Sequence, residues 1–491
     1  EFRRVLFRSP FRMGDGRSAP AGQMFYVYDL AKGIAYSPSF TPLRRHDSVY
    51  DVTFSPGMAC YRSNKDELEI ELSVFVAPNA PIEFKLLRIR NNSSIPRLLQ
   101  IVPAIEVILA ETPSESLGAI TSRVEDDLKA IYFQNPSNKF VNGWAFVATS
   151  LSAEHAETSR RRFLGHENRT SHIPYMVEHG HPDAGAPEQQ RKIAAFCGAV
   201  DAQPGQDYHI VIALGQTDTY EQAQELALRA KNADYAIQIL QESQTTWDKQ
   251  LSVLRIKTNQ PAFDRLVNDW LPYQLFAARL WGRTGPSQRS GATGYRDQLQ
   301  DVIPLIALSP ERAKMQILLH ARHQYLEGDA CKWWHRAPNG GTGLADRTHS
   351  SDPHLWLPYV TLKYIQGTGD QGILSEIEPF LEANQVPFGQ EGEATVPLIS
   401  RDRDTILGHC IRAIDYSLGR FGSHDLPLVG SGDWDDGMHL VGAEGKGESV
   451  WLGFFLHGIL LDIAPLIEAR GDHQRVDRSE EHTSELQSRG L

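Results

Sequence analysis

The spacing of apolar residues changes near residue 219, and this change constrains the fold more than any other feature of the sequence. Before it, apolar and polar residues alternate with period two, most clearly over residues 68–74 and 82–86. Such alternation is typical of strands with one buried face. We therefore predict a large antiparallel β-sandwich over residues 22–215, with further strands at 98–109, 130–133, 144–148, 193–200 and 209–214 and a long polar loop over 152–192.

After residue 219 the apolar residues recur at helical spacing. Thr219 and Gln222 form the pattern of a capping box, and a helical run follows to Leu240. We predict a helical linker over residues 216–261 and an α/α barrel over 262–477. The expected barrel helices are 262–283, 299–308, 311–326, 354–367, 372–382, 402–418 and 449–469.

Both ends of the chain carry the pattern of a cloning or sequencing artefact. One nucleotide strand can encode residues 478–486, and its reverse complement can encode residues 1–9. We expect residues 1–9 and 478–491 to derive from adapter sequence and exclude them from fold reasoning. The natural protein is then expected to continue beyond both ends, which makes residues 10–477 an internal fragment.

Composition limits the class of partner. The net charge of −12 argues against a nucleic-acid partner, which would need a basic face. The apolar run over residues 453–467 is interrupted by His457 and Asp462 and is short for a bilayer. The four cysteines lie far apart and fit no metal spacing, so we expect a reduced, cytoplasmic protein with no metal site.

Residues 425–456 contain a Gly-rich acidic loop built around one tryptophan. Asp433, Asp435 and Asp436 surround Trp434, and Glu448 stands at the head of the apolar run that follows. Tryptophan offers an apolar face on which a sugar can stack, and aspartate binds hydroxyls or donates a proton. A helix-capping loop with solvated acids is the alternative interpretation.

This loop resembles the active-site loop of the inverting phosphorylases of glycoside hydrolase family 94, the cellobiose phosphorylase family. The same family supplies the C-terminal region of cyclic β-1,2-glucan synthases. Its pattern is Asp-Trp-Asn-Asp, so Asp435 departs from it at the third position. The resemblance implies that Asp436 is the general acid and that Trp434 lines the same sugar subsite. It also implies a β-sandwich, a helical linker and an (α/α)6 barrel, here truncated. Residues 430–438 and 447–456 favour the β-1,2-glucan branch.

Residues 279–301 form a second candidate region, predicted as a basic, Gly-rich connection between two helices. Residues 295–301 are similar to the family element Arg-Asp-x-x-Gln-Asp. The resemblance implies that Asp297 holds hydroxyls of the transferred sugar, with Arg296 and Asp301 beside it. Arg283 is the best match for a phosphate-binding arginine, and Arg289 and Arg279 are its rivals. A structural ion pair between Arg296 and Asp301 is the alternative.

Residues 329–359 form the third candidate region for a substrate site. Trp333 and Trp334 precede a Gly-rich loop and suit the stacking of an acceptor sugar. The stretch resembles a segment of the glucan-synthase branch that carries Ser-Asp-Asp, whereas here Pro353 follows Asp352. Asp352 is therefore the expected ligand.

The resemblance implies phosphorolysis of β-glucosides with inorganic phosphate as co-substrate and no other cofactor. Phosphate is already an anion, so one acid suffices, whereas a hydrolase needs a second carboxylate. We expect the pKa of Asp436 to be raised by apolar burial or by its acidic neighbours. The family's other phosphate ligands lie well beyond the acid, so we expect residues 10–477 alone to be inactive. The alternatives are an α/α-barrel glycoside hydrolase and a carbohydrate-binding or inactive module. An oligosaccharide is the expected partner, and a homodimer is possible; this chain is expected to make no membrane contact.

Overall fold

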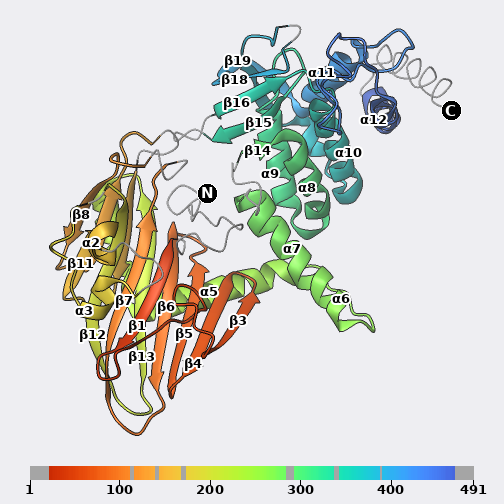
Figure 1. The fold of residues 1–491 in the computed structure, drawn as a ribbon. Coiled ribbons are helices and arrows are strands. Elements are labelled where there is room, and N and C mark those ends of the chain that lie inside the picture. Colours follow the sequence, from red (N-terminus) through yellow and green to blue (C-terminus); the bar gives the residue numbers. More distant parts are fainter. Residues whose placement is uncertain are drawn as a thin grey trace. The chain divides into compact units, whose positions relative to one another are not determined.

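The computed structural model describes residues 22–110, 116–138, 143–166, 173–188, 190–282, 292–336, 342–387 and 390–469. The chain divides into two compact units, Glu1–Ser252 and Val253–Leu491. Unit 1 runs from red to green in Figure 1, and unit 2 runs from green to blue.

Unit 1 contains two antiparallel sheets. A five-stranded sheet has the order β11-β12-β7-β1-β2, and an eight-stranded sheet has the order β3-β4-β5-β6-β13-β10-β9-β8. The strands are β1 (Gln23–Asp29), β2 (Ile34–Tyr36), β3 (Val49–Ser55), β4 (Met58–Lys65), β5 (Leu68–Val76), β6 (Ile82–Asn91), β7 (Arg97–Val107), β8 (Thr121–Glu125), β9 (Ala130–Gln134), β10 (Trp144–Thr149), β11 (His155–Ser159), β12 (Lys192–Ala202) and β13 (Asp207–Thr217).

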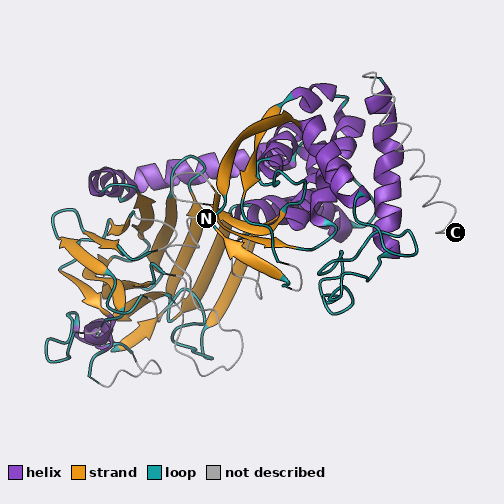
Figure 2. Cartoon of the chain, turned by 90° about the horizontal axis from the view of Figure 1, so that it is seen from above, coloured by secondary structure: helices purple, strands orange, loops and turns teal. Residues whose placement is uncertain are grey.

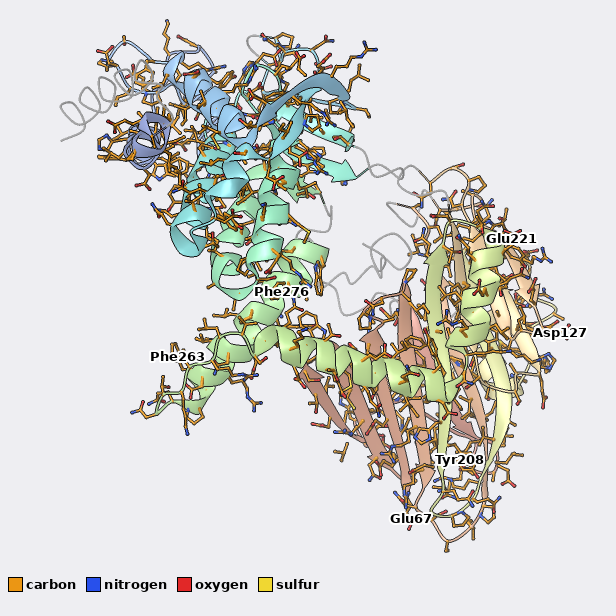
Figure 3. All side chains as sticks on the ribbon, turned by 180° about the vertical axis from the view of Figure 1, so that it is seen from behind. Glu67, Asp127, Tyr208, Glu221, Phe263 and Phe276 are labelled. Atoms are coloured by element: carbon orange, nitrogen blue, oxygen red, sulfur yellow. The ribbon has the colours of Figure 1, made fainter. Side chains whose placement is uncertain are left out.

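Period-two alternation gives unit 1 its core. Leu68, Ile70 and Leu72 of β5 are buried and pack with Phe25 and Ile101 of the other sheet in one apolar cluster. Alternate residues of a strand point to opposite faces, so the remaining apolar residues cover the outer faces. Figure 2 shows the strands of this unit and the helices beside them. In Figure 3, Glu67 and Tyr208 lie at the opposite end of this unit from Glu221.

Helices cover both outer faces of the sandwich. α4 (Tyr220–Ala230) and α5 (Ala233–Leu251) pack small and apolar side chains on the eight-stranded sheet. The predicted capping box is present, because Thr219 Oγ1 accepts from Gln222 N at 3.3 Å and Gln222 Oε1 accepts from Thr219 N at 3.3 Å.

The predicted polar loop over residues 152–192 is wrong in part, because its described residues include β11, α2 (Arg160–Leu164) and α3 (Tyr175–His179). Phe163, Met176 and Val177 explain the difference. They are buried in a cluster on the outer face of the five-stranded sheet.

Unit 2 begins with a run of helix. α6 (Pro261–Arg265), the π-helical segment η1 (Leu266–Trp270), α7 (Leu271–Gln274) and the π-helical segment η2 (Leu275–Gly282) follow without a break. Figure 3 labels Phe263 and Phe276 on this run; Phe263 is exposed and Phe276 is buried. The helices that follow are α8 (Tyr295–Leu308), α9 (Pro310–Ala321), α10 (Trp356–Thr368), α11 (Ile406–Leu418) and α12 (Val450–Glu468).

α10 lies in the middle of the helices of unit 2. It contacts α8, α9, α11 and α12, and most of its side chains are buried. α12 is long and apolar enough to cross a membrane by length and composition, a test that core helices also pass. Phe455 of α12 packs on Trp356 of α10 with ring centroids 4.8 Å apart, as expected of a core helix.

Unit 2 also contains strands that the spacing of apolar residues did not predict. β14 (Thr293–Gly294), β15 (Cys331–Arg336), β16 (Thr342–Thr348) and β18 (Gly392–Thr395) form one sheet, and β17 (Ile377–Glu382) pairs with β19 (Leu398–Thr405). The predicted helix over 372–382 is wrong: a 3-10 turn, η4 (Gln371–Ser375), leads into β17. The predicted helix over 402–418 begins only at Ile406, because its first residues belong to β19.

Candidate active site

The acidic loop is fastened to the segment that precedes α10. Ser351 N donates to the carbonyl of Gly432 at 2.9 Å, and Ser431 N donates to the carbonyl of His349 at 3.2 Å. Gly430 has φ +60°, and a Cβ there would lie 1.8 Å from the carbonyl oxygen of His349. Only glycine permits this approach, so the Gly-rich sequence serves to dock the loop.

Arg296, in the first turn of α8, joins three parts of the site. Its Nη2 donates to Asp436 Oδ1 at 2.7 Å, and its Nη1 donates to the Asp433 carbonyl at 2.9 Å and to Asp352 Oδ2 at 3.2 Å. A planar guanidinium with several donors can satisfy all three acceptors at once. The alternative pairing of Arg296 with Asp301 is wrong, because Asp301 pairs with Arg279 at 2.9 Å.

Asp436 is exposed and bound by two cations. Its side chain is 61% exposed, and Lys332 of β15 reaches Oδ1 at 3.4 Å. Partial burial acts to raise the pKa of Asp436, but the charges and hydrogen bonds of Arg296 and Lys332 outweigh it and lower the pKa. The expectation of a raised pKa for Asp436 is therefore wrong, because cations rather than acids dominate the surroundings of this carboxyl group.

Asp352, in contrast to Asp436, is a buried residue of the site. It is fully buried and accepts hydrogen bonds from Arg296 and, at 3.0 Å, from Trp356 Nε1. Burial raises its pKa, although the charge of Arg296 acts in the opposite direction. The prediction that Asp352 is a direct sugar ligand does not agree with this position. In this structure its carboxylate holds Arg296 in place instead.

The tryptophans of the site differ in exposure. Trp434 is 52% exposed beside Asp436, as a stacking platform requires, whereas Trp334 is 1% exposed. Trp334 stacks on His323 with ring centroids 3.9 Å apart, so the prediction that it stacks on an acceptor sugar is wrong. Trp333, its neighbour in β15, is half-buried, so part of its ring is exposed for contact with a sugar.

The element over residues 295–301 is helical rather than part of a connection. α8 begins at Tyr295, and Asp297 is exposed in its first turn, where the helix dipole favours an acid. Burial raises the pKa of Asp301, against the effect of Arg279. Arg283 and Arg289 lie outside the described residues, and Arg279 is engaged with Asp301.

Glu448 holds the start of the loop. Its Oε1 accepts from the backbone N–H of His424 and its Oε2 contacts His424 Nδ1, both at 2.8 Å. The carboxylate is thus engaged in local structure, and a sugar hydroxyl would have to compete with His424 for it.

Sequence reasoning missed Lys332 and Ser449. Ser449 Oγ donates to Asp433 Oδ2 and accepts from the backbone N–H of Leu452 in the first turn of α12. One side chain thus caps the helix and holds the acidic loop. Lys332 could have been found from the sequence, because it is a charged residue directly before the tryptophan pair that was already a candidate for sugar binding. Among the described residues, no group of three or more His, Cys, Asp or Glu side chains is placed to hold a metal ion.

Two models of known sequence families match the chain. The glycosyl hydrolase 94 supersandwich domain matches residues 9–233, and the glycosyl hydrolase 94 superfamily catalytic domain matches residues 246–489. The chain belongs to glycoside hydrolase family 94. The fold prediction, an antiparallel sandwich followed by a helical catalytic domain, is confirmed.

Several known proteins are similar to the chain. It is 32% identical to the cyclic beta-(1,2)-glucan synthase NdvB of Rhizobium meliloti (strain 1021) over 95% of its own length and 16% of that protein. It is 26% identical to the solabiose phosphorylase of Paenibacillus borealis over 92% of its length and 56% of the relative. A bacterial glucoamylase structure superposes with a TM-score of 0.59 at 10% identity over 96% of this chain and 61% of that one, which shows a shared fold.

The chain therefore spans about half the length of the phosphorylase relative and a sixth of the synthase. Two of the similar proteins, both from Paenibacillus borealis, are a solabiose phosphorylase and a 3-O-beta-D-glucopyranosyl-beta-D-glucuronide phosphorylase. Phosphorylase relatives use phosphate as co-substrate, and an oligosaccharide substrate fits them.

Proposed function

We propose that this chain supplies the sandwich and the acid-bearing part of an inverting phosphorylase that acts on β-1,2-linked gluco-oligosaccharides. The observation that carries the proposal is the exposed Asp436 beside the exposed Trp434, on a loop that Arg296 and two glycines hold in place. A proton donor next to an aromatic face is what cleavage of a glycosidic bond requires.

The reaction needs one proton transfer. Phosphate oxygen attacks the anomeric carbon from the face opposite the leaving group, the bond from that carbon to the leaving oxygen breaks, and protonated Asp436 gives its proton to that oxygen. The β-glucoside becomes α-glucose 1-phosphate. In the reverse direction Asp436 accepts the proton of the acceptor hydroxyl, and the ionised state favoured by Arg296 and Lys332 suits that role.

Neighbouring carboxylates support the single-acid assignment. Asp433 accepts from Ser449 and from the backbone N–H of Asp435, and Asp352 is buried under Arg296. Both are engaged in holding the loop. Asp297 and Trp434 are proposed to hold the transferred glucosyl unit, since both are exposed in the same unit.

Two relatives support the β-1,2 linkage. One is the glucan synthase above, and the other is a 1,2-beta-oligoglucan phosphorylase of Listeria innocua serovar 6a, 27% identical over 33% of this chain and 14% of that protein. We propose a cytoplasmic location.

The test compares β-1,2-, β-1,3- and β-1,4-linked glucose oligomers with and without inorganic phosphate, using residues 10–477 and a version extended to the length of the phosphorylase relatives. The extended version is expected to release glucose 1-phosphate from the β-1,2 oligomers only when phosphate is present, whereas residues 10–477 alone are expected to release none. Release of free glucose without phosphate would indicate a hydrolase, and binding without turnover would indicate an inactive module.

A further inference from the structure

Lys332 occupies an irregular position in β15. Cys331 pairs with Arg347 of β16 and Trp333 pairs with Asp346, so two steps along β15 correspond to one step along β16. Lys332 is the extra residue of this β-bulge. Bulges occur next to active sites, where they change the direction in which a side chain points.

The bulge coincides with an ion pair across the site. Lys332 Nζ lies 3.4 Å from Asp436 Oδ1, the same oxygen that Arg296 contacts at 2.7 Å. Two cations from different elements, β15 and α8, thus converge on a single carboxylate oxygen. The Lys332 side chain is 30% exposed, so solvent screens the pair in part.

We propose that Lys332 is a positioning residue for Asp436, and that the bulge in β15 directs its ammonium group to hold this carboxylate ionised. The proposal deepens the function proposed above, since it concerns the same acid. In the cleavage direction Asp436 must then take up a proton against the charges of Lys332 and Arg296.

The other charged groups around Asp436 have different tasks. Arg296 also binds Asp352 and the Asp433 carbonyl, so it holds the loop as well as the acid. Asp433 and Asp435 lie on the same loop as Asp436. Burial raises the pKa of Asp346 in β16, the charge of Lys332 acts to lower it, and the charge of Glu391 acts to raise it. Lys332 can therefore be changed without removing the contacts that fasten the loop.

The experiment is a direct titration of Asp436. Protein labelled with ¹³C at the aspartate carboxyl carbons is followed by NMR against pH, and Asp436→Asn identifies the resonance. Lys332→Met is expected to move the midpoint of Asp436 to higher pH by a few tenths of a pH unit, the scale of a half-exposed ion pair. Lys332→Arg keeps the charge and is expected to keep the midpoint.

Lys363→Met is the matched control, because Lys363 is 32% exposed and lies 3.3 Å from Asp462 in the same unit. An unchanged midpoint in Lys332→Met, or the same change in Lys363→Met, would overturn the proposal. If Lys332→Met fails to fold, Lys332→Gln is read in the same way. The titration needs no turnover, so it separates this inference from the function itself: an active Asp436→Asn enzyme would remove the catalytic role and leave the titration result standing.

Discussion

Asp436 and Asp352 bind the same guanidinium group, yet they differ in nearly every other property. Asp436 is 61% exposed on a glycine-rich loop, whereas Asp352 is fully buried at the start of α10. At Asp436 the neighbouring cations outweigh the effect of partial burial and lower the pKa. At Asp352 burial outweighs the charge of Arg296 and raises the pKa. The site thus has an exposed layer that can reach a substrate and a buried layer that supports it. Residue type alone does not assign a side chain to either layer.

The largest effect is expected in the exposed layer, from Asp436→Asn. In a version extended to the length of the phosphorylase relatives, removing the proton donor should lower turnover of β-gluco-oligosaccharides by about 10²–10⁴-fold and leave oligosaccharide binding largely intact. Asp435→Asn is the matched control, since it changes an exposed neighbour on the same loop and should keep turnover. Initial rates and binding titrations of both variants check this. Near-normal turnover in Asp436→Asn would remove it from the role of acid.

The next effect is expected in the buried layer, from Trp334→Ala. Trp334 is 1% exposed and packs on His323, His320 and Tyr295, so its removal should cost about 3–5 kcal/mol of unfolding free energy. Denaturant unfolding of this variant measures the cost, with the half-buried Trp333→Ala as comparison. A variant of normal stability that no longer binds acceptor sugar would place Trp334 in the exposed layer after all.

Acid should weaken the buried layer selectively. Burial lowers the pKa of His320 to about 4 and that of His354 to about 3, below their ordinary value of about 6.5 in the unfolded chain. The unfolded state therefore binds more protons below pH 6.5, and stability falls as pH falls from about 6.5 to about 4. His320 alone should account for roughly 3 kcal/mol of this loss. The unfolding free energy of His320→Gln should change less with pH over this window than that of the parent protein; equal slopes would contradict the assignment.

The smallest effects are expected from Trp434→Ala and Asp297→Ala. Each removes one exposed group from the proposed subsite, which should weaken binding of the donor sugar roughly tenfold, or about 1.4 kcal/mol. Neither side chain is buried, so thermal stability should stay within experimental error. Calorimetric binding and thermal unfolding measure the two quantities separately. Wild-type binding with reduced stability would favour a structural role for both.

Much of the fold could be predicted from local spacing. The alternation over residues 68–74 and 82–86 lies within β5 and β6, and the Thr219 capping box begins α4. The spacing identified the elements but not their burial, because Glu83 and Lys85 of β6 are as fully buried as Ile82 and Phe84. The short strands β17 and β19 could not be found in this way, since β19 is largely polar and its pairing with β17 depends on tertiary contacts.

The sequence indicated candidate site residues, which stay predictions, but it did not indicate which of their side chains are buried. Asp436, Trp434 and Asp297 are exposed, although apolar burial was one of the expectations for Asp436, whereas Asp352 and Trp334 are buried. Their burial depends on α8 and α10 and on the strand β15, which lie far apart in the sequence. The ion pair of Lys332 with Asp436 depends on a bulge, and no local pattern indicates where two strands lose register. For the same reason the direction of the Asp436 pKa was predicted wrongly.

The central claim is that one acid and a phosphate nucleophile cleave the β-glucosidic bond with inversion. The most direct measurement is a ¹H NMR time course of a β-1,2-gluco-oligosaccharide incubated in phosphate with the chain extended to the length of its phosphorylase relatives. The claim predicts that α-glucose 1-phosphate is the first product, that its rate of formation depends on phosphate, and that Asp436→Asn abolishes it. First formation of β-glucose 1-phosphate, or of free glucose at a rate independent of phosphate, would contradict it.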